Sequence, residues 1–92
     1  MFLMPQAEAE IVNKLGLHAR AAAKLTRLAG GFAAQVWLSR NGRRVNAKSI
    51  MGVMMLAAGK GSRVLIEANG EDAEGALAAI ARLIAERFGE AE

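Results

Sequence analysis

The stretch that decides the fold is QVWLSRNGRRVN, residues 35–46. Its first half alternates Val36 and Leu38 with Trp37 and polar residues, which is the period of a strand with one buried face. The pair Asn41-Gly42 follows, and this pair favours a two-residue hairpin turn because both residues tolerate positive φ. Residues 43–46 are then expected to run back antiparallel to residues 35–40. The sequence therefore predicts two adjacent antiparallel strands near the middle of the chain.

On the N-terminal side of this hairpin, a strand and a helix are expected. A weak alternation from Glu8 to Lys14 predicts a half-buried strand, which Gly16 ends. Apolar residues then recur at steps of four, four and three, which predicts a helix that Gly30-Gly31 terminates. The apolar stripe of this helix is Leu17, Ala21, Leu25 and Leu28, and a basic stripe beside it is Arg20, Lys24 and Arg27.

On the C-terminal side, Ser49 is the expected N-cap of a short uncharged helix over residues 50–56. A turn at Gly59-Lys60-Gly61 closes it, and residues 63–68 form a further strand. After Asn69-Gly70 comes the longest amphipathic helix, with acidic residues where the helix dipole favours them. Those acids are Glu71, Asp72 and Glu74, and the apolar face is Leu77, Ile80, Leu83, Ile84 and Phe88.

The element order β-α-β-β-α-β-α predicts an α+β fold. Helices between antiparallel strands favour an open-faced sandwich, in which one face of the sheet packs against helices and the other meets solvent. Trp37, opposite in phase to its neighbours, is expected on the open face as a surface aromatic. With 92 residues, below the usual size of about 100–150, the chain is expected to form one domain over residues 1–92.

The composition excludes several kinds of site. There is no cysteine and one histidine, which rules out disulfides, thiolate metal sites, cysteine nucleophiles and multi-histidine cages. We expect neither a metal nor a cofactor. No signal peptide and no apolar run of roughly 20 residues is present, so we expect a soluble protein without membrane insertion, located in the cytoplasm.

Charge is distributed unevenly along the chain. Ten of the twelve Lys and Arg lie between Lys14 and Arg63, a span with no acidic residue. The middle of the chain should therefore prefer an anionic partner: a phosphate group, an acidic protein surface or a nucleic acid. A nucleic-acid-binding module is the weakest of these, because only Trp37 provides a strand aromatic and no RNP1-type motif is present.

His18 is the candidate for chemistry. It stands at the expected start of the first helix, where unpaired amides of Ala19, Arg20 and Ala21 and the helix dipole favour a bound anion. Arg20 adds a guanidinium suited to phosphate oxygens. The alternative is a helix-capping or surface histidine without a further task. A serine hydrolase is not indicated, because no G-x-S-x-G motif exists.

Two segments, GLHARAAAKL at 16–25 and NAKSIMGVMML at 46–56, resemble the histidine phosphocarrier (HPr) family of the bacterial sugar phosphotransferase system. This resemblance implies an open-faced sandwich of four antiparallel strands with three helices on one face. It also implies a carrier with a transferase role rather than an independent enzyme. Such a carrier accepts a phosphoryl group from phosphorylated enzyme I and passes it to an enzyme IIA domain.

By position, His18 matches the phosphorylated histidine of the family, which reacts through Nδ1, and Arg20 matches the arginine beside it. Ser49 matches a serine that a dedicated HPr kinase/phosphorylase phosphorylates in some lineages. Ala21 departs from the family, which usually has proline there. This departure leaves open a paralogous carrier in a regulatory, nitrogen-type phosphorelay.

A docking patch is expected on the short helix. If Val53 and Leu56 face inward, with Gly52 allowing close approach to the sheet, the other arc projects outward. Methionine side chains suit a surface that must accommodate more than one partner. The alternative is that the whole uncharged helix is core. The predicted patch consists of Ile50, Met51 and Met54, together with Leu17, Lys24 and Arg27.

Overall fold

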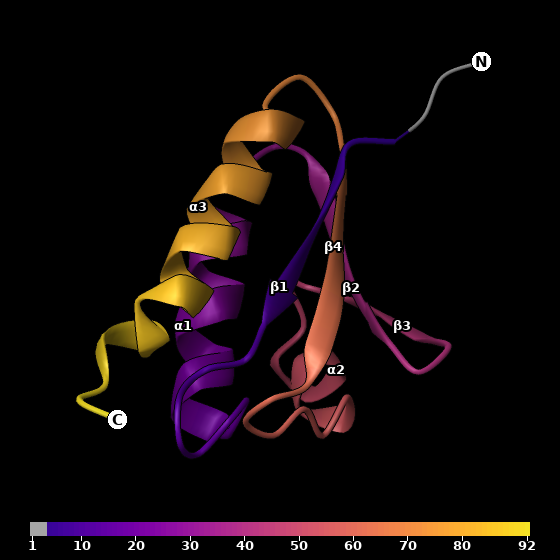
Figure 1. Cartoon of the computed structure of the whole chain (residues 1–92). Helices are drawn as coiled ribbons and strands as arrows, with labels where there is room; N and C mark the ends of the chain where they lie inside the picture. The colour runs from indigo at the N-terminus through magenta and orange to yellow at the C-terminus, as the bar shows by residue number, and fades with distance from the viewer. Residues whose placement is uncertain (1–3) are drawn as a thin grey trace.

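The molecule consists of a four-stranded antiparallel sheet with helices on one face (Figure 1). The computed structural model describes residues 4–92. Its strands are β1 (Gln6–Glu10), β2 (Gln35–Arg40), β3 (Arg43–Asn46) and β4 (Arg63–Asn69). Its helices are α1 (Ala19–Gly30), α2 (Ile50–Met55) and α3 (Ala73–Ala85), followed by the 3₁₀ turn η1 (Arg87–Gly89). The predicted fold class and element order are confirmed.

The hairpin predicted around Asn41-Gly42 is present. β2 pairs with β3 from Arg40 opposite Arg43 to Trp37 opposite Asn46. Asn41 and Gly42 have φ of 51° and 81°, the left-handed pair that a tight hairpin needs. β4 pairs with β1 and β2, so the strand order is β1-β4-β2-β3. Adjacent strands are thus built largely from segments far apart in the sequence.

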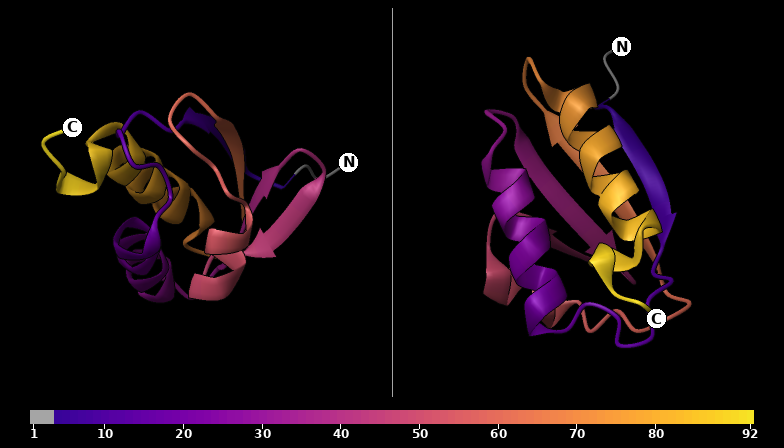
Figure 2. Two further views of the ribbon diagram at one scale, coloured as in Figure 1. Left: turned by 90° about the horizontal axis from the view of Figure 1, so that it is seen from below. Right: turned by 90° about the vertical axis from the view of Figure 1, so that its left-hand side faces the viewer.

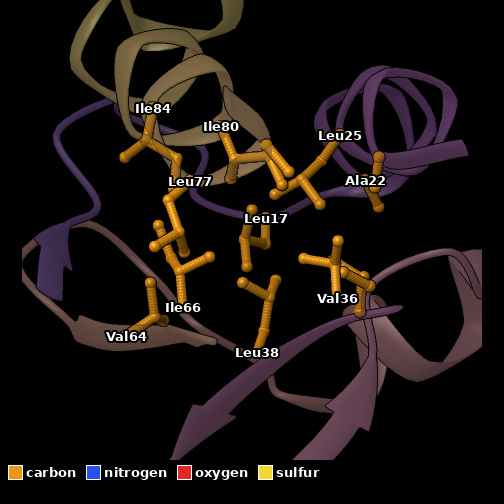
Figure 3. Close-up of a cluster of buried hydrophobic side chains, with 14 of the residues drawn as sticks. Leu17, Ala22, Leu25, Val36, Leu38, Val64, Ile66, Leu77, Ile80 and Ile84 are labelled. Atoms are coloured by element: carbon orange, nitrogen blue, oxygen red, sulfur yellow. The ribbon is translucent and has the colours of Figure 1, made fainter. Parts of the chain in front are cut away.

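The core lies between the sheet and the helices. Figure 2 shows α1 and α3 side by side over one face of the sheet. Figure 3 shows the side chains that fill the space between these layers. The sheet contributes Val36, Leu38, Val64 and Ile66, and the helices contribute Leu25, Leu77, Ile80 and Ile84, all of them buried.

The open face carries Trp37, as expected. Its ring is half-buried, and the Arg44 guanidinium lies 4.1 Å from the ring centroid. Arg44 also pairs with Glu67, Nε to Oε1 at 3.3 Å. These contacts cover the ring from within the sheet itself. No helix of residues 4–92 combines the length and the apolar character that crossing a membrane requires.

The first strand and first helix have different limits from those predicted. The strand expected over residues 8–14 is β1, Gln6–Glu10, and the chain turns at Asn13, whose carbonyl accepts from the Gly16 N–H at 3.2 Å. The helix expected from Leu17 begins at Ala19, because His18 is its N-cap with extended backbone angles. Side chains of Asn and His that bond to nearby backbone groups end regular structure at both places.

The last helix is also shorter than its apolar pattern. α3 ends at Ala85, and Phe88 reaches the core from η1 with a φ of 56°. Asp72 does not cap α3 through its side chain. Its carboxylate instead accepts from the N–H groups of Ala33 and Ala34, each at 2.8 Å. These two backbone donors, Ala33 first, lower the pKa of the Asp72 carboxyl, so this acid ties the loop before β2 to the start of α3.

Candidate functional site

His18 occupies the start of α1, and its ring caps the helix. The Arg20 N–H donates to Nδ1 of His18 at 3.3 Å. Since a backbone N–H can only donate, Nδ1 presents its lone pair toward the first turn. The His18 side chain remains 28% exposed. The capping role that was the alternative reading is therefore real, and it leaves the ring accessible.

The other ring nitrogen contacts a carboxylate from the far end of the chain. Nε2 of His18 lies 2.5 Å from Oε2 of Glu90. Oε1 of Glu90 accepts from Nδ2 of Asn13 at 3.0 Å, and Nδ2 also donates to the carbonyl of Gly16 at 2.9 Å. The hydrogen bonds from His18 and then Asn13 are the main causes that lower the pKa of the Glu90 carboxyl.

Glu90 and Asn13 were both missed by the sequence reasoning. Glu90 is 72 residues from His18 and 77 from Asn13, so no local spacing connects them. Asn13 was assigned to a strand, whereas its side chain is fully buried in the turn before α1. Asparagine and glycine are both common in turns, so Asn13 together with Gly16 was the hint available in the sequence.

The first turn of α1 supplies the predicted backbone donors. The first helical hydrogen bond runs from the Ala22 N–H to the His18 carbonyl at 2.8 Å. The amides of Ala19, Arg20 and Ala21 come before it and have no partner of that kind. The Arg20 side chain is exposed and lines an open hollow of about 670 Å³ together with His18, Leu15 and Glu90. A phosphate-sized anion has room there.

Ser49 caps α2, as predicted. Its Oγ accepts from the Gly52 N–H at 3.1 Å, and the side chain is exposed. A Cβ on Gly52 would lie 3.3 Å from both this Oγ and Cβ of Val45. Glycine therefore permits the close approach of α2 to the sheet that the sequence indicated.

The expected orientation of α2 is also confirmed. Val53 is fully buried and Leu56 is 3% exposed, whereas Met51 is 66% exposed. The predicted outward residues Ile50 and Met54 are exposed as well, and so are two apolar residues that were not predicted, Met55 and Leu15. Figures 1 and 2 agree that α2 lies at the same end of the molecule as the first turn of α1.

The three members of the predicted patch outside α2 differ in their exposure and contacts. Leu17 is 5% exposed and belongs to the core (Figure 3), so its assignment to a docking surface is wrong. It lies in the bend before the His18 cap, and its side chain is among those that fill the space between the helices and the sheet. Lys24 donates from Nζ to the carbonyl of Phe88 at 2.6 Å, which ties α1 to the C-terminal segment. Arg27 is exposed on α1.

Comparisons with known proteins relate this chain to phosphocarrier proteins. A family model described as the PTS HPr component phosphorylation site matches residues 5–86. The phosphocarrier protein HPr of Cupriavidus necator is 64% identical over 89 residues, covering 97% of this chain and 100% of that protein. A more distant relative, the phosphocarrier protein NPr of Shewanella violacea, is 41% identical over 86 residues, covering 94% of each.

A solved structure gives the same result for the fold. The crystal structure of HPr-C-His from Thermoanaerobacter tengcongensis superposes with a TM-score of 0.93 at 44% identity. The match covers 97% of this chain and 100% of that one. The arrangement of sheet and helices is therefore shared over nearly the full length of both chains.

Proposed function

The chain belongs to the HPr family of phosphocarrier proteins, and on that premise we propose that His18 carries the phosphoryl group. The observation that carries this proposal is the state of the His18 ring. Its Nδ1 already presents a lone pair at a helix start, beside the exposed Arg20 and an open hollow. A nucleophile in this state requires no separate base to remove a proton.

In the proposed step, Nδ1 attacks the phosphorus carried by enzyme I. The Nδ1–P bond forms with the histidine lone pair, and the bond from phosphorus to its donor atom on enzyme I breaks. The Arg20 amide, which caps Nδ1 in the free protein, is then available to a phosphoryl oxygen, as are the neighbouring amides of Ala19 and Ala21. The Arg20 guanidinium adds charge-assisted hydrogen bonds. Transfer to an enzyme IIA domain reverses these events.

Both partners must approach the same histidine, so one surface has to serve twice. The exposed apolar side chains of α2, Ile50, Met51 and Met54, are the proposed contact, with Arg27 as a basic neighbour that favours acidic partners. We place this exchange in the cytoplasm, with residues 1–92 acting as a single phosphocarrier domain. The protein is a carrier that undergoes transfer at both steps, without turnover of its own.

Ser49 is proposed as a regulatory phosphorylation site for an HPr serine kinase. A phosphate there would add about −1.5 to −2 charges at the start of α2, where the helix dipole favours it. The same charge would stand among the apolar docking residues and repel an acidic partner. Regulation would then act on docking while the helix itself stays folded.

Sugar transport and nitrogen-type regulation are the two branches to distinguish. The higher identity to an HPr, 64%, than to an NPr, 41%, favours the sugar branch.

To test the proposed function, the protein is to be incubated with phosphoenolpyruvate and enzyme I. Its mass gain is then measured, and the phosphorylated residue is mapped before and after acid treatment. We expect one acid-labile phosphate on His18 that a sugar-type IIA domain removes faster than a nitrogen-type one. A stable phosphate, or one mapped to another residue, would refute the assignment of His18.

A further inference from the structure

The residue that faces the non-reacting nitrogen of His18 has a role of its own. We propose that Glu90 is a positioning residue for phosphoryl transfer: its carboxylate holds the His18 proton on Nε2 and thereby keeps the lone pair on Nδ1. The effect of Glu90 on phosphoryl transfer rests on the proposed function of His18. Its structural basis, the tautomer of the free ring, stands independently of any phosphate.

The two partners of the ring select one tautomer. A neutral imidazole carries one N–H and one lone pair. The Arg20 amide, 3.3 Å from Nδ1, requires the lone pair there, and the Glu90 carboxylate, 2.5 Å from Nε2, requires the hydrogen there. Only the Nε2–H tautomer of the neutral ring satisfies both contacts. The contact with Glu90 is the shorter and involves a charge, so it is the stronger of the two.

Glu90 is itself held in place. Nδ2 of Asn13 lies between two acceptors, Oε1 of Glu90 and the Gly16 carbonyl, and this fixes which end of the asparagine amide faces the carboxylate. Asn13 is fully buried, so it has little freedom to turn. Two residues before Glu90, the Phe88 carbonyl is held by Lys24. The Glu90 side chain is only 18% exposed, which strengthens its electrostatic contact with the ring.

The negative Glu90 carboxylate also stabilises the positive charge that develops on the His18 ring during transfer. When Nδ1 forms its bond to phosphorus, the ring keeps the Nε2 proton and becomes a cation. No proton moves in this step, because the electron pair of the broken bond leaves with the donor group. Glu90 then faces an imidazolium through an ion pair. When the phosphoryl group departs, the ring returns to neutral. A carboxylate that orients a reacting histidine in this way is known from hydrolytic triads.

Glu90→Gln tests the proposal sharply. Asn13 continues to require an oxygen from residue 90, so the amide nitrogen of the new side chain is directed at Nε2 of His18. Because that nitrogen can only donate, it competes with the Arg20 amide for the single lone pair of the neutral ring. The Arg20 contact is long, at 3.3 Å, so the ring proton is expected to move mainly to Nδ1. Nitrogen-15 spectra of the neutral ring should change from mainly Nε2–H in the parent to mainly Nδ1–H in the variant. Glu90→Ala should give a mixture of the two.

The kinetic consequence is measured with two donors. Phosphoramidate, a small-molecule donor, reports on the ring without docking, and phosphorylated enzyme I reports on the complete reaction. Losing one charge-assisted hydrogen bond at this ring should slow both rates about tenfold. Glu86→Gln is the matched control, since it removes the same charge from an exposed carboxylate that pairs with Arg82 on α3. It should leave the tautomer and both rates unchanged.

The outcomes separate the two proposals. Parent-like nitrogen spectra in Glu90→Gln, or an unchanged rate with phosphoramidate, would overturn the role of Glu90. A loss seen with enzyme I but not with phosphoramidate would also overturn it and would assign Glu90 to docking. If the parent itself accepted no phosphate on His18, the proposed function would fail, and the nitrogen spectra would still decide what Glu90 does to the ring.

Discussion

The starts of α1 and α2 are built alike and are held differently. Each helix begins with a side chain that caps it: Nδ1 of His18 accepts from the Arg20 amide at 3.3 Å, and Oγ of Ser49 accepts from the Gly52 amide at 3.1 Å. Beyond its own first turn, His18 is held by Glu90, 72 residues away. The cap at Ser49 uses only the residues around it.

The surroundings of the two caps differ in the same way. His18 lies among Arg20, Asn13 and Glu90, so its ring is oriented by charge and hydrogen bonds. Ser49 is followed by the exposed apolar residues Ile50 and Met51. A capped helix start is therefore suited to chemistry or to docking, depending on which residues the rest of the chain places beside it.

The largest expected effect comes from removing the ring at the start of α1. His18→Ala should abolish acid-labile phosphorylation, because the only imidazole in the chain is gone. The fold should persist with a loss of about 1–3 kcal/mol, since both the long cap bond and the charge-assisted hydrogen bond to Glu90 are removed. Mass spectrometry after incubation with enzyme I, and thermal unfolding, check both statements. Full acid-labile phosphorylation of the variant would contradict the proposed role of His18.

The next effect concerns docking at α2. Met51→Glu should weaken binding to enzyme I by about 1–2 kcal/mol, roughly five- to thirtyfold in Kd, because a charge replaces an exposed apolar contact. Phosphorylation by phosphoramidate should be unaffected. Ala78→Glu places the same charge on an exposed position of α3 and serves as the control in the same titration. Equal weakening by both variants would mean that net charge, and not the surface of α2, controls binding.

A smaller change is expected from the arginine beside His18. Arg20→Ala should still accept phosphate but should transfer it roughly three- to tenfold more slowly, because an exposed charge-assisted contact is lost while the backbone amides remain. Single-turnover transfer to an enzyme IIA domain measures this. Arg82→Ala, an exposed arginine on α3, should not alter the rate. Identical rates for parent and Arg20→Ala would remove Arg20 from the site.

The smallest effect is at the cap of α2. Ser49→Ala should lower the free energy of unfolding by about 0.5–2 kcal/mol and leave phosphorylation of His18 intact, which is the reverse of the pattern for His18→Ala. Ser49→Asp should retain the cap and weaken enzyme I binding through its charge. Denaturant unfolding and a binding titration separate the two roles. Unaltered affinity of Ser49→Asp would argue against the proposed charge switch.

The parts of the fold that the sequence predicted are those with local signals. Asn41-Gly42 determined a hairpin, Ser49 determined a helix start, and the alternation of Val36 and Leu38 determined a buried face, because each depends on residues within a few positions. Strand β1 was displaced because Asn13 bonds within a turn, and that bond competes with the weak alternation around it. Local patterns cannot resolve such a competition when both outcomes bury the same residues.

For the candidate site, too, the residues predicted from the sequence are those with local signals. His18, Arg20 and Ser49 were placed correctly at the two helix starts, and the outward arc of α2 followed from its spacing. Glu90 was missed because its role depends on where the chain returns after α3, and Leu17 was misplaced because it precedes the cap. Both errors concern the direction of a side chain outside regular structure, which periodicity does not specify.

The contact between His18 and Glu90 can form only late during synthesis of the chain. The ribosome adds Glu90 72 positions after His18. The central hairpin forms from neighbouring residues and can fold while synthesis continues, whereas β1 must wait for β4. The ring of His18 therefore acquires its full set of partners only after residue 90 has been added, so a nascent chain carries the histidine long before it carries the carboxylate that contacts it.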